Sequence, residues 1–221
     1  MQKPIVNYRK LRPNTISSAE FKHLKLLLFW PVFGLLFMFV ERFYRVDYYY
    51  PMYCKFDDLI PFCEWFLIPY LFWFIYLIGM HLYTLLYDID TFNRMMKYII
   101  ITYSAAMVIY FIFPTCQQLR PIEFERDNIL TRFIAGFYQF DTNTNVCPSI
   151  HVMGSLAVME AALYSKAIKS KGVKTTFVIA AVLICLSTVF MKQHSVLDVI
   201  AALPICLAAH FLCYRHSVIK S

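Results

Sequence analysis

Charged residues are scarce in this chain. Asp, Glu, Lys and Arg make up 16% of its 221 residues, while hydrophobic residues make up 60%. A soluble domain typically has about 25% charged and about 45–50% apolar residues. The composition therefore excludes an ordinary soluble domain and indicates a protein that crosses the membrane several times.

Cysteine motifs and a cleavable leader are missing as well. The seven cysteines form no CxxC pair and no cysteine–histidine spacing typical of a zinc site. This argues against a disulfide framework and a structural zinc centre. The first apolar run begins after residue 23 and lacks a small-residue cleavage site, so we interpret it as an uncleaved anchor.

The apolar runs predict an all-α fold, a polytopic bundle of six transmembrane helices, because each run approaches the roughly 20 residues that a bilayer requires. The expected spans are residues 24–40, 66–87, 95–113, 149–166, 175–190 and 196–214. Together they predict one membrane domain at 24–215, between an N-terminal cytoplasmic tail at 1–23 and a C-terminal tail at 216–221. The long polar segment 114–147 is interpreted as the loop that can hold an elaborate site.

Lys and Arg are distributed unevenly over the connecting segments. With the N-terminus inside, fourteen of the 21 fall on the inner side and seven on the outer side. Because cytoplasmic segments carry the excess of positive charge, we expect both termini in the cytoplasm. The net charge of +7 reflects this distribution, and no nucleic-acid partner is expected.

Four polar residues that are far apart in the sequence reach the same outer leaflet in this topology. They are Arg120 after the third span, His151 at the start of the fourth, His194 in the turn before the sixth, and Asp198 at the start of the sixth. Each alone is more simply a polar residue at a helix end. Ionisable groups at membrane depth are costly and usually functional, so their convergence indicates a site.

The residue types suit phosphoryl transfer. Asp198 lies four residues after His194, hence on the same helical face. Its carboxylate can hold the imidazole tautomer and leave the other ring nitrogen free as a nucleophile. His151 can act as the general acid toward a leaving oxygen. The sequence therefore predicts a catalytic set of His194, His151 and Asp198 at the outer face.

Phosphate-binding groups are expected beside this set. Arg120 offers a planar fork of donors, and the backbone N–H groups of Ser149 and Ile150 begin a helix, which is a natural anion site. The mechanism requires no cofactor. The acidic pairs at 57–58 and 88–90 fall on opposite sides of the membrane, so we interpret them as solvated turns and expect no metal site.

The motifs resemble those of the type-2 phosphatidic acid phosphatase superfamily over roughly residues 60–214. Residues 147–152, Cys-Pro-Ser-Ile-His-Val, resemble its central Pro-Ser-Gly-His motif. Ser187, His194 and Asp198 have the spacing of its third motif, and Arg120-Pro121 matches the end of its first. The resemblance implies a phosphohistidine at His194, oriented by Asp198. It also implies the residues around it: His151 to protonate the leaving group, and Arg120, Ser149 and Ser187 to bind phosphate.

The chain departs from the family pattern at three positions. Phe113 stands where the first motif has lysine, Thr188 where the third has arginine, and Ile150 replaces the glycine. Lys192 in the neighbouring turn could restore one charge. These losses resemble the branch containing inositol phosphorylceramide synthases and sphingomyelin synthases, as do the segments 58–62 and 69–70. Fewer cations suit a phosphodiester, which carries one negative charge where a monoester carries nearly two.

These features predict an integral-membrane phosphoesterase that acts on a lipid phosphate through a phosphohistidine. An alternative is a lipid head-group phosphotransferase, in which a lipid alcohol instead of water accepts the group. A further alternative is a non-catalytic protein that binds lipid head groups, and another is a small transporter that uses Glu160 and His81. The expected partner of either enzyme is a membrane lipid.

Overall fold

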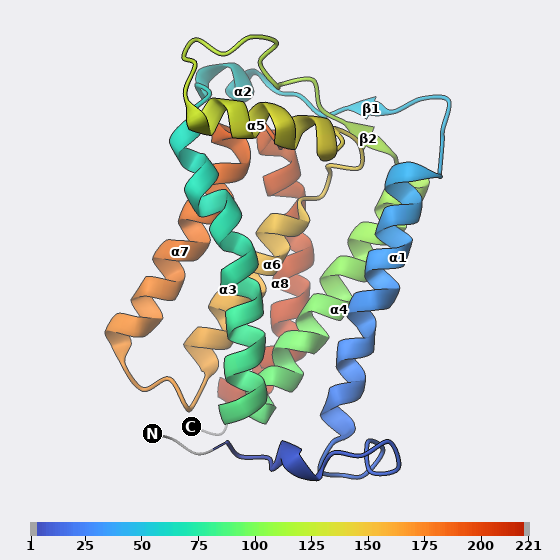
Figure 1. Cartoon of the computed structure of the whole chain (residues 1–221), viewed down its shortest axis with the longest axis vertical. Helices are drawn as coiled ribbons and strands as arrows, with labels where there is room; N and C mark the ends of the chain where they lie inside the picture. Colours follow the sequence, from blue (N-terminus) through green and yellow to red (C-terminus); the bar gives the residue numbers. More distant parts are fainter. Residues whose placement is uncertain (1–3, 219–221) are drawn as a thin grey trace.

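The computed structural model describes residues 4–218, with side chains up to Arg215. Long helices run side by side in one bundle (Figure 1): α1 (Phe29–Arg42), α3 (Leu67–Tyr87), α4 (Ile89–Ile112), α6 (Ile150–Tyr164), α7 (Lys171–Phe190) and α8 (Val196–Val218). One end of the bundle, called the α5 end below, carries α2 (Lys55–Leu59), α5 (Ile129–Phe140) and the paired strands β1 (Tyr50–Pro51) and β2 (Thr115–Cys116). Short 3-10 helices lie at Tyr8–Lys10, Lys22–Leu28 and Glu64–Phe66.

Five helical stretches are long and apolar enough to cross a membrane: Lys22–Arg42, Glu64–Tyr87, Ile89–Ile112, Lys171–Phe190 and Val196–Arg215. The prediction of a helical integral-membrane protein is confirmed at this level. Helix α6 is apolar but has 15 residues, which span about 22 Å, less than the ~30 Å hydrocarbon core of a bilayer. The predicted total of six spans therefore stays a prediction.

Helix α6 lies at the centre of the bundle and contacts α3, α4, α7 and α8. Small residues make this position possible, because they let neighbouring helix backbones approach closely. Gly154, Ala157 and Ala161 are buried on α6. A Cβ atom added at Gly154 would lie 2.5 Å from the Tyr103 hydroxyl and 3.1 Å from Trp73 Nε1, so this position requires glycine.

The connection expected between the predicted spans 66–87 and 95–113 contracts to a single residue, Asp88, between α3 and α4. Its carboxylate accepts the Thr91 N–H at 3.1 Å, which caps α4, and the Ser165 hydroxyl at 2.7 Å. Asp88 is buried, at 9% exposure. The interpretation of this acidic residue as part of a solvated turn is wrong, because its carboxylate joins the start of α4 to the segment after α6.

The described part of the N-terminal tail packs against the bundle. The Tyr8 hydroxyl donates to the Leu85 carbonyl at 2.7 Å and lies 2.9 Å from His23 Nε2. Phe21 and His23 are buried. At the other end of the chain, α8 continues to Val218, so the predicted tail at 216–221 begins inside this helix. Its last three residues lie outside the described part, and the division into domains otherwise stays a prediction.

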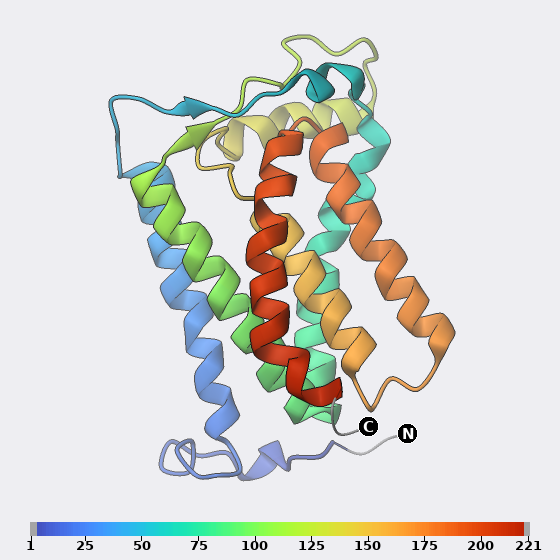
Figure 2. The ribbon, with the colours of Figure 1, turned by 180° about the vertical axis from the view of Figure 1, so that it is seen from behind.

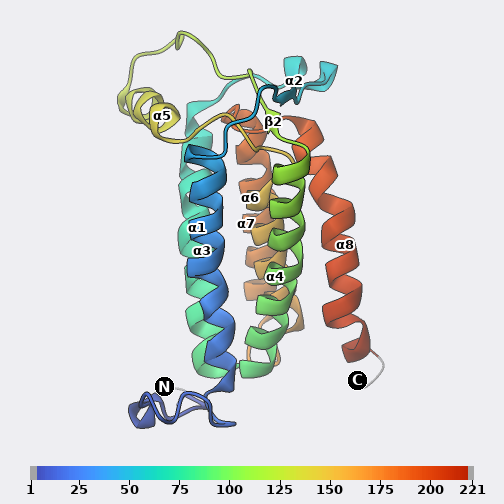
Figure 3. The same ribbon diagram turned by 90° about the vertical axis from the view of Figure 1, so that its right-hand side faces the viewer.

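The segment 114–147 is not a plain loop, because it contains α5. Asn128 caps this helix by accepting the N–H groups of Leu130 and Thr131 at 2.9 and 3.1 Å. Helix α5 lies across the α5 end of the bundle, transverse to the long helices (Figures 1 and 3). Its buried Ile134 packs in one cluster with Tyr70 and Met191. An apolar face thus holds this segment over the ends of α3 and α7.

The strand pairing fixes the chain that leads into α6. Strands β1 and β2 pair in parallel above the ends of α1 and α4, as the view from behind shows (Figure 2). The Asn145 N–H donates to the Thr115 carbonyl at 2.6 Å, and the Cys147 N–H donates to the Thr115 hydroxyl at 3.0 Å. Residues 143–147 are therefore held against β2 just before α6 begins.

Candidate active site

His194 lies in a tight turn between α7 and α8. The N–H groups of Gln193 and His194 both donate to the Thr188 carbonyl, each at 3.0 Å. Lys192 has a left-handed backbone with φ 51°, which is uncommon for a residue other than glycine. The turn thus reverses the chain within five residues, 191–195, and leaves the His194 ring facing the start of α6.

Asp198 orients the His194 ring. The Asp198 Oδ2 atom lies 3.1 Å from His194 Nδ1 and also accepts the Ser195 N–H at 3.0 Å. Asp198 is fully buried. A carboxylate beside Nδ1 keeps the proton on that nitrogen, so Nε2 carries the free lone pair. The predicted one-face spacing of these two residues is present in the structure.

The Cys147 thiol lies beside the Asp198 carboxylate. Burial, together with this negative charge, raises the pKa of Cys147 to about 12. The group is therefore a neutral thiol at physiological pH. A neutral S–H is a weak donor, so Cys147 places a proton, and no further negative charge, against Asp198.

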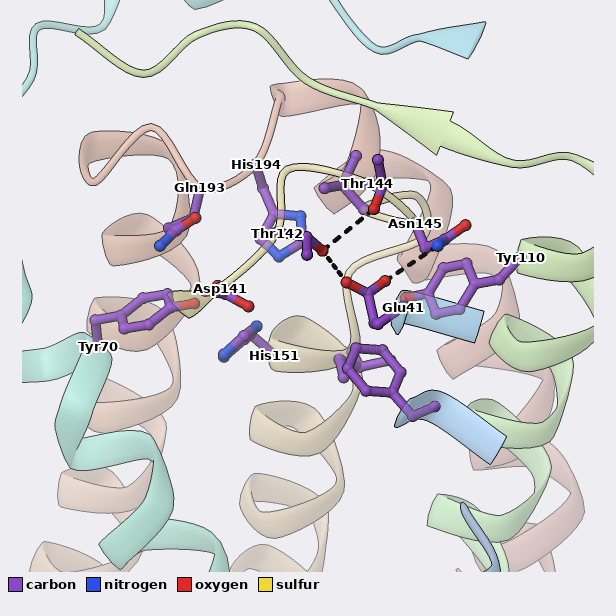
Figure 4. A pocket seen from close by; sticks show the side chains of 13 residues that line it. Glu41, Tyr70, Tyr110, Asp141, Thr142, Thr144, Asn145, His151, Gln193 and His194 are labelled. Atoms are coloured by element: carbon purple, nitrogen blue, oxygen red, sulfur yellow. Dashed lines mark hydrogen bonds between the residues drawn. The ribbon is translucent and has the colours of Figure 1, made fainter. Parts of the chain in front are cut away.

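His151 lies in the first turn of α6 and faces His194, with ring centroids 5.6 Å apart. Rings from α3 enclose it on the other side, with the Tyr70 centroid at 4.7 Å and the Trp73 centroid at 4.5 Å. Its Nδ1 atom has no hydrogen-bond partner within residues 4–218. The two predicted catalytic histidines therefore meet, one from α6 and the other from the turn between α7 and α8 (Figure 4).

Hydrogen bonds from α4 and α8 fix the start of α6. The Ser149 N–H donates to the Asp198 carbonyl at 3.1 Å. The Tyr103 hydroxyl donates to the Ile150 carbonyl at 3.1 Å, and the Tyr110 hydroxyl donates to the Pro148 carbonyl at 2.7 Å. The Ser149 N–H, predicted to bind phosphate, is thus occupied by backbone in this structure. Ile150 lines the cavity described next.

A small cavity opens in front of the two histidines. Its lining includes three aromatic residues and two carboxylates, which come from α1, α3, α4 and the segment after α5. The residues that line it are Phe37, Glu41, Tyr70, Tyr110, Asp141, Thr142, Thr144, Asn145, Val146, Ile150, His151, Gln193 and His194. Neither Lys nor Arg belongs to this lining, which differs from the cationic site that the sequence predicts.

Glu41, at the end of α1, connects that helix to the segment before α6. Its Oε1 atom accepts the Asn145 side-chain amide at 3.0 Å, and its Oε2 atom accepts the Thr142 hydroxyl. Figure 4 shows this carboxylate at the cavity wall opposite His151. Glu41 therefore brings a carboxyl group to the cavity from a helix far away in the sequence.

Asp141 directly follows α5 and reaches the cavity between Tyr70 and the two histidines (Figure 4). Its carboxylate is 38% exposed, and Asp141 lines the cavity. Burial raises the pKa of Asp141, while the positive charges of Arg120 and His194 oppose this shift. A second carboxylate thus lies beside the predicted nucleophile.

Arg120 lies behind the cavity, where it holds three backbone carbonyls. Its guanidinium donates to Tyr138 O at 3.0 Å, to Asp141 O at 2.8 Å and to Thr142 O at 2.9 Å. It also donates to Gln193 Oε1 and stacks 4.6 Å from the centre of the Tyr138 ring. Burial lowers the pKa of Arg120, and Asp141 opposes the shift. The guanidinium clamps the segment after α5 to the His194 turn.

Lys192 and Ser187 also lie outside the cavity lining. The Lys192 ammonium donates to the carbonyls of Asp57 and Ile60, at 2.7 and 2.5 Å. The Ser187 hydroxyl is buried and donates to the Ile184 carbonyl at 2.6 Å. Both predicted phosphate ligands therefore make contacts within the protein and do not reach the histidines.

Asp57 is a residue of the site that the sequence did not indicate. Its carboxylate accepts the Val196 N–H at 2.8 Å and the Ser195 hydroxyl at 2.6 Å, so it caps α8 from outside that helix. It is 2% exposed, which corrects the interpretation of Asp57 as part of a solvated turn, while Asp58 is exposed. Position alone gave no signal, because a cap supplied by a segment about 140 residues away in sequence leaves no local pattern.

Other residues missed from the sequence carried weak signals. Glu41 is an acid at the end of an apolar helix, Gln193 directly precedes His194, and Asp141 follows α5. Each resembles an ordinary helix-end or turn residue when read alone. Among the side chains that the structure describes, no group of three His, Cys, Asp or Glu is arranged to hold a metal ion.

Comparison with known proteins identifies the family. No curated protein and no solved structure matches the chain. The family model described as the PAP2 superfamily matches residues 94–219, which is more than half of the 221 residues. The match includes Arg120, His151 and His194 and leaves out α1, α2 and α3. This chain belongs to the PAP2 superfamily.

Proposed function

We propose that this protein is a membrane phosphoesterase that acts on a lipid phosphate through a phosphohistidine at His194. The single observation that carries the proposal is the pairing of His194 Nδ1 with Asp198 Oδ2 at 3.1 Å while the ring faces His151 across the cavity. Membership of the PAP2 superfamily supports a phosphoesterase or phosphotransferase.

The first step forms a bond between His194 Nε2 and the phosphorus atom and breaks the bond from phosphorus to the leaving oxygen. His151, when protonated, gives its proton to that oxygen. Asp198 stabilises the positive charge that develops on the His194 ring, as a carboxylate does beside a catalytic imidazole. The carboxyl groups of Glu41 and Asp141 line the same cavity.

The second step reverses these roles. Neutral His151 takes a proton from the attacking oxygen, that oxygen bonds to phosphorus, and the bond to His194 breaks. Water as the attacking group gives hydrolysis, while a lipid alcohol gives head-group transfer. The transfer reaction of the inositol phosphorylceramide and sphingomyelin synthase kind is the second candidate, supported by the absence of Lys and Arg from the cavity lining.

The two positions where the family pattern has cations also favour a phosphodiester over a phosphate monoester. Phe113 stacks on Tyr50, with ring centroids 4.2 Å apart. Thr188 is buried, and its hydroxyl donates to the Cys185 carbonyl at 2.8 Å. Neither side chain can offset the second negative charge of a phosphate monoester, so a singly charged diester suits the cavity better.

We also propose that the site faces the non-cytoplasmic side and that both termini are cytoplasmic. The supporting observation is the charge distribution, with twice as many Lys and Arg assigned to the inner side as to the outer. A lipid substrate follows from this placement, because the cavity lies near the end of a helical bundle that has five candidate membrane spans.

The test uses purified protein in detergent with phosphatidic acid, isoprenyl pyrophosphate, and phosphatidylinositol or phosphatidylcholine with a lipid alcohol. We expect phosphate release or head-group transfer from at least one substrate, abolished in His194→Ala. His151→Ala is expected to lose about 10²–10⁴-fold in kcat. His210→Gln is the matched control. His210 lies on α8, pairs with Glu160 of α6 and does not line the cavity. Equal activity of wild type and His194→Ala on every substrate would reject the proposal.

A further inference from the structure

The side-chain amide of Gln193 forms part of the cavity wall. Gln193 lines the cavity and is 2% exposed, and Figure 4 shows it beside His194 and near Tyr70. Its nitrogen, Nε2, has no hydrogen-bond partner among the described residues. A buried donor left unpaired is costly. Such a donor in a cavity wall points to a ligand that accepts its hydrogen bond.

Arg120 determines which end of this amide is free. Its guanidinium contacts one end of the Gln193 amide. A guanidinium has only donors, so the atom it contacts is the oxygen Oε1. The nitrogen Nε2 is therefore directed away from Arg120 with its hydrogens unused. Arg120 itself is held by three backbone carbonyls and lies 4.0 Å from the Asp141 carboxylate, so the orientation of the amide is fixed.

The same turn carries this amide and the candidate nucleophile. The N–H groups of Gln193 and His194 both donate to the Thr188 carbonyl, each at 3.0 Å. The two side chains therefore leave one hydrogen-bonded turn at adjacent positions. A phosphoryl group attacked by His194 brings its oxygens to the part of the cavity wall that Gln193 forms.

Four other donors in the cavity lining already have acceptors within the protein. They are the Asn145 amide and the hydroxyls of Thr142, Thr144 and Tyr110. Each would give up a hydrogen bond in order to bind a phosphoryl oxygen, whereas Gln193 would give up none. Gln193 is thus better prepared than these four to bind an incoming oxygen.

We propose that Gln193 is a further catalytic residue, which donates from Nε2 to a non-bridging oxygen of the phosphoryl group transferred to His194. The proposal rests on the function proposed above and names a residue that takes the place of the absent cations. Charge on a transferring phosphoryl group is spread over its non-bridging oxygens. A donor already aimed at this charge stabilises the transition state without reorganisation. Arg120 then acts through Gln193, as a positioning residue.

Two substitutions separate the donor from the acceptor of the Gln193 amide. Gln193→Met removes both without adding charge, whereas Gln193→Glu keeps an oxygen for Arg120 and loses the donor. We expect both to lower kcat on the preferred substrate by about 10²–10³-fold, as removal of an oxyanion-hole donor does, while Gln193→Glu keeps the wild-type Tm. A Gln193→Glu variant as active as wild type would show that only the acceptor matters and would overturn the proposal.

Gln118→Met is the matched control for the same change of side chain. Gln118 is exposed and does not line the cavity, so this variant should keep the wild-type kcat. A loss of kcat in Gln118→Met equal to that in Gln193→Met would overturn the assignment of the effect to the cavity.

The role of Arg120 is tested by Arg120→Lys in two backgrounds. In the wild-type background we expect kcat to fall with little change in KM, because the amide is less well oriented. In Gln193→Met the same substitution should cause no further loss of kcat. Equal fold losses in both backgrounds would show that Arg120 does not act through Gln193.

Binding of orthovanadate, an analogue of the transferring phosphoryl group, gives a readout that requires no substrate. We expect orthovanadate to raise the Tm of wild type and of Gln118→Met, and this shift to disappear in Gln193→Met. If no substrate shows His194-dependent turnover, the proposed function fails, and the Tm shift alone decides whether Gln193 binds a phosphoryl group. His194-dependent turnover with no shift in wild type, or with equal shifts in wild type and Gln193→Met, would overturn the inference and leave the proposed function standing.

Discussion

A single glycine determines how closely α6 approaches its neighbours. Gly154 leaves room for the Tyr103 hydroxyl, which would lie 2.5 Å from an added Cβ atom. That hydroxyl donates to the Ile150 carbonyl, next to His151. The position of the candidate general acid thus depends on the absence of a side chain one turn further along the helix.

We expect Gly154→Ala to destabilise the protein and reduce activity. Overpacking a buried site of this kind costs about 1–3 kcal/mol, and the displaced Tyr103 ring releases the start of α6. Thermal unfolding in detergent and kcat on the preferred substrate measure the two effects. Gly79→Ala is the control, because an added Cβ there meets nothing within 4 Å. Equal effects of both variants would contradict the account.

Asp141 predicts a pH dependence of stability. Burial raises its pKa, so the folded state favours the protonated carboxyl more than the unfolded chain does. This contribution to the free energy of unfolding is present at low pH and is lost as the pH rises through the raised pKa. The charged and titratable groups around Asp141 from other elements are Arg42, Arg120, His194, His151, Glu41, Tyr70 and Tyr138.

Asp141→Asn should therefore raise the Tm at neutral pH and leave it close to wild type at acidic pH, where the wild-type carboxyl is already neutral. Tm measured against pH for both proteins gives the difference. A Tm difference that grows on acidification would show that the charged carboxylate is the stabilising form and would contradict the direction of the shift.

Short-range spacing made part of the site predictable at the residue level. The four-residue separation of His194 and Asp198 predicts their contact, and the structure has it at 3.1 Å. The contacts of Arg120 were not predictable, because its carbonyl partners lie 18 to 22 residues away in a segment whose path depends on α5. The left-handed backbone of Lys192 likewise gives its side chain a direction that sequence does not reveal.

At the scale of elements, α2 controls the turn that carries His194. Asp57 caps α8 through the Ser195 hydroxyl and the Val196 N–H, and Lys192 donates to the Asp57 carbonyl. The same turn receives the Tyr138 hydroxyl at the Met191 carbonyl. Helices α2 and α5 thus position the candidate nucleophile, although His194 lies in the turn between α7 and α8.

Asp57→Ala should remove the external cap and lower the free energy of unfolding by about 1–2 kcal/mol. We also expect kcat to fall with little change in KM, because His194 would be less well placed while the cavity wall remains. Asp58→Ala is the control, since Asp58 is exposed and accepts a hydrogen bond from the Tyr53 hydroxyl. A loss of stability without any change in kcat would show that the cap does not position His194.

Apolar runs predicted the long helices well and the transverse helix poorly. Helix α4 begins at Ile89, six residues before the predicted span, because Asp88 caps it and its first turns are partly polar. Helix α5 was interpreted as loop, because its apolar residues occupy one face among polar neighbours. Hydropathy finds helices surrounded by lipid on most sides, and it misses one that lies across the end of the bundle.

At the scale of the whole molecule, orientation decides which compartment the cavity opens to. We expect epitopes at both termini to be protected from protease in sealed, right-side-out vesicles. An epitope inserted in the segment 121–127, at the α5 end, should be cleaved in the same vesicles. Detergent permeabilisation, which should expose all three, is the control. Cleavage at the termini and protection of 121–127 would reverse the proposed orientation.

The central claim is that His194 carries the phosphoryl group, and trapping the phospho-enzyme tests it most directly. The purified protein is quenched during turnover of a substrate labelled at phosphorus, and the bound label is treated with acid and with alkali. We predict label that is acid-labile and alkali-stable, located at His194, reduced in Asp198→Asn and absent in His194→Ala. Turnover without any such label, or equal labelling of His194→Ala, would contradict the account.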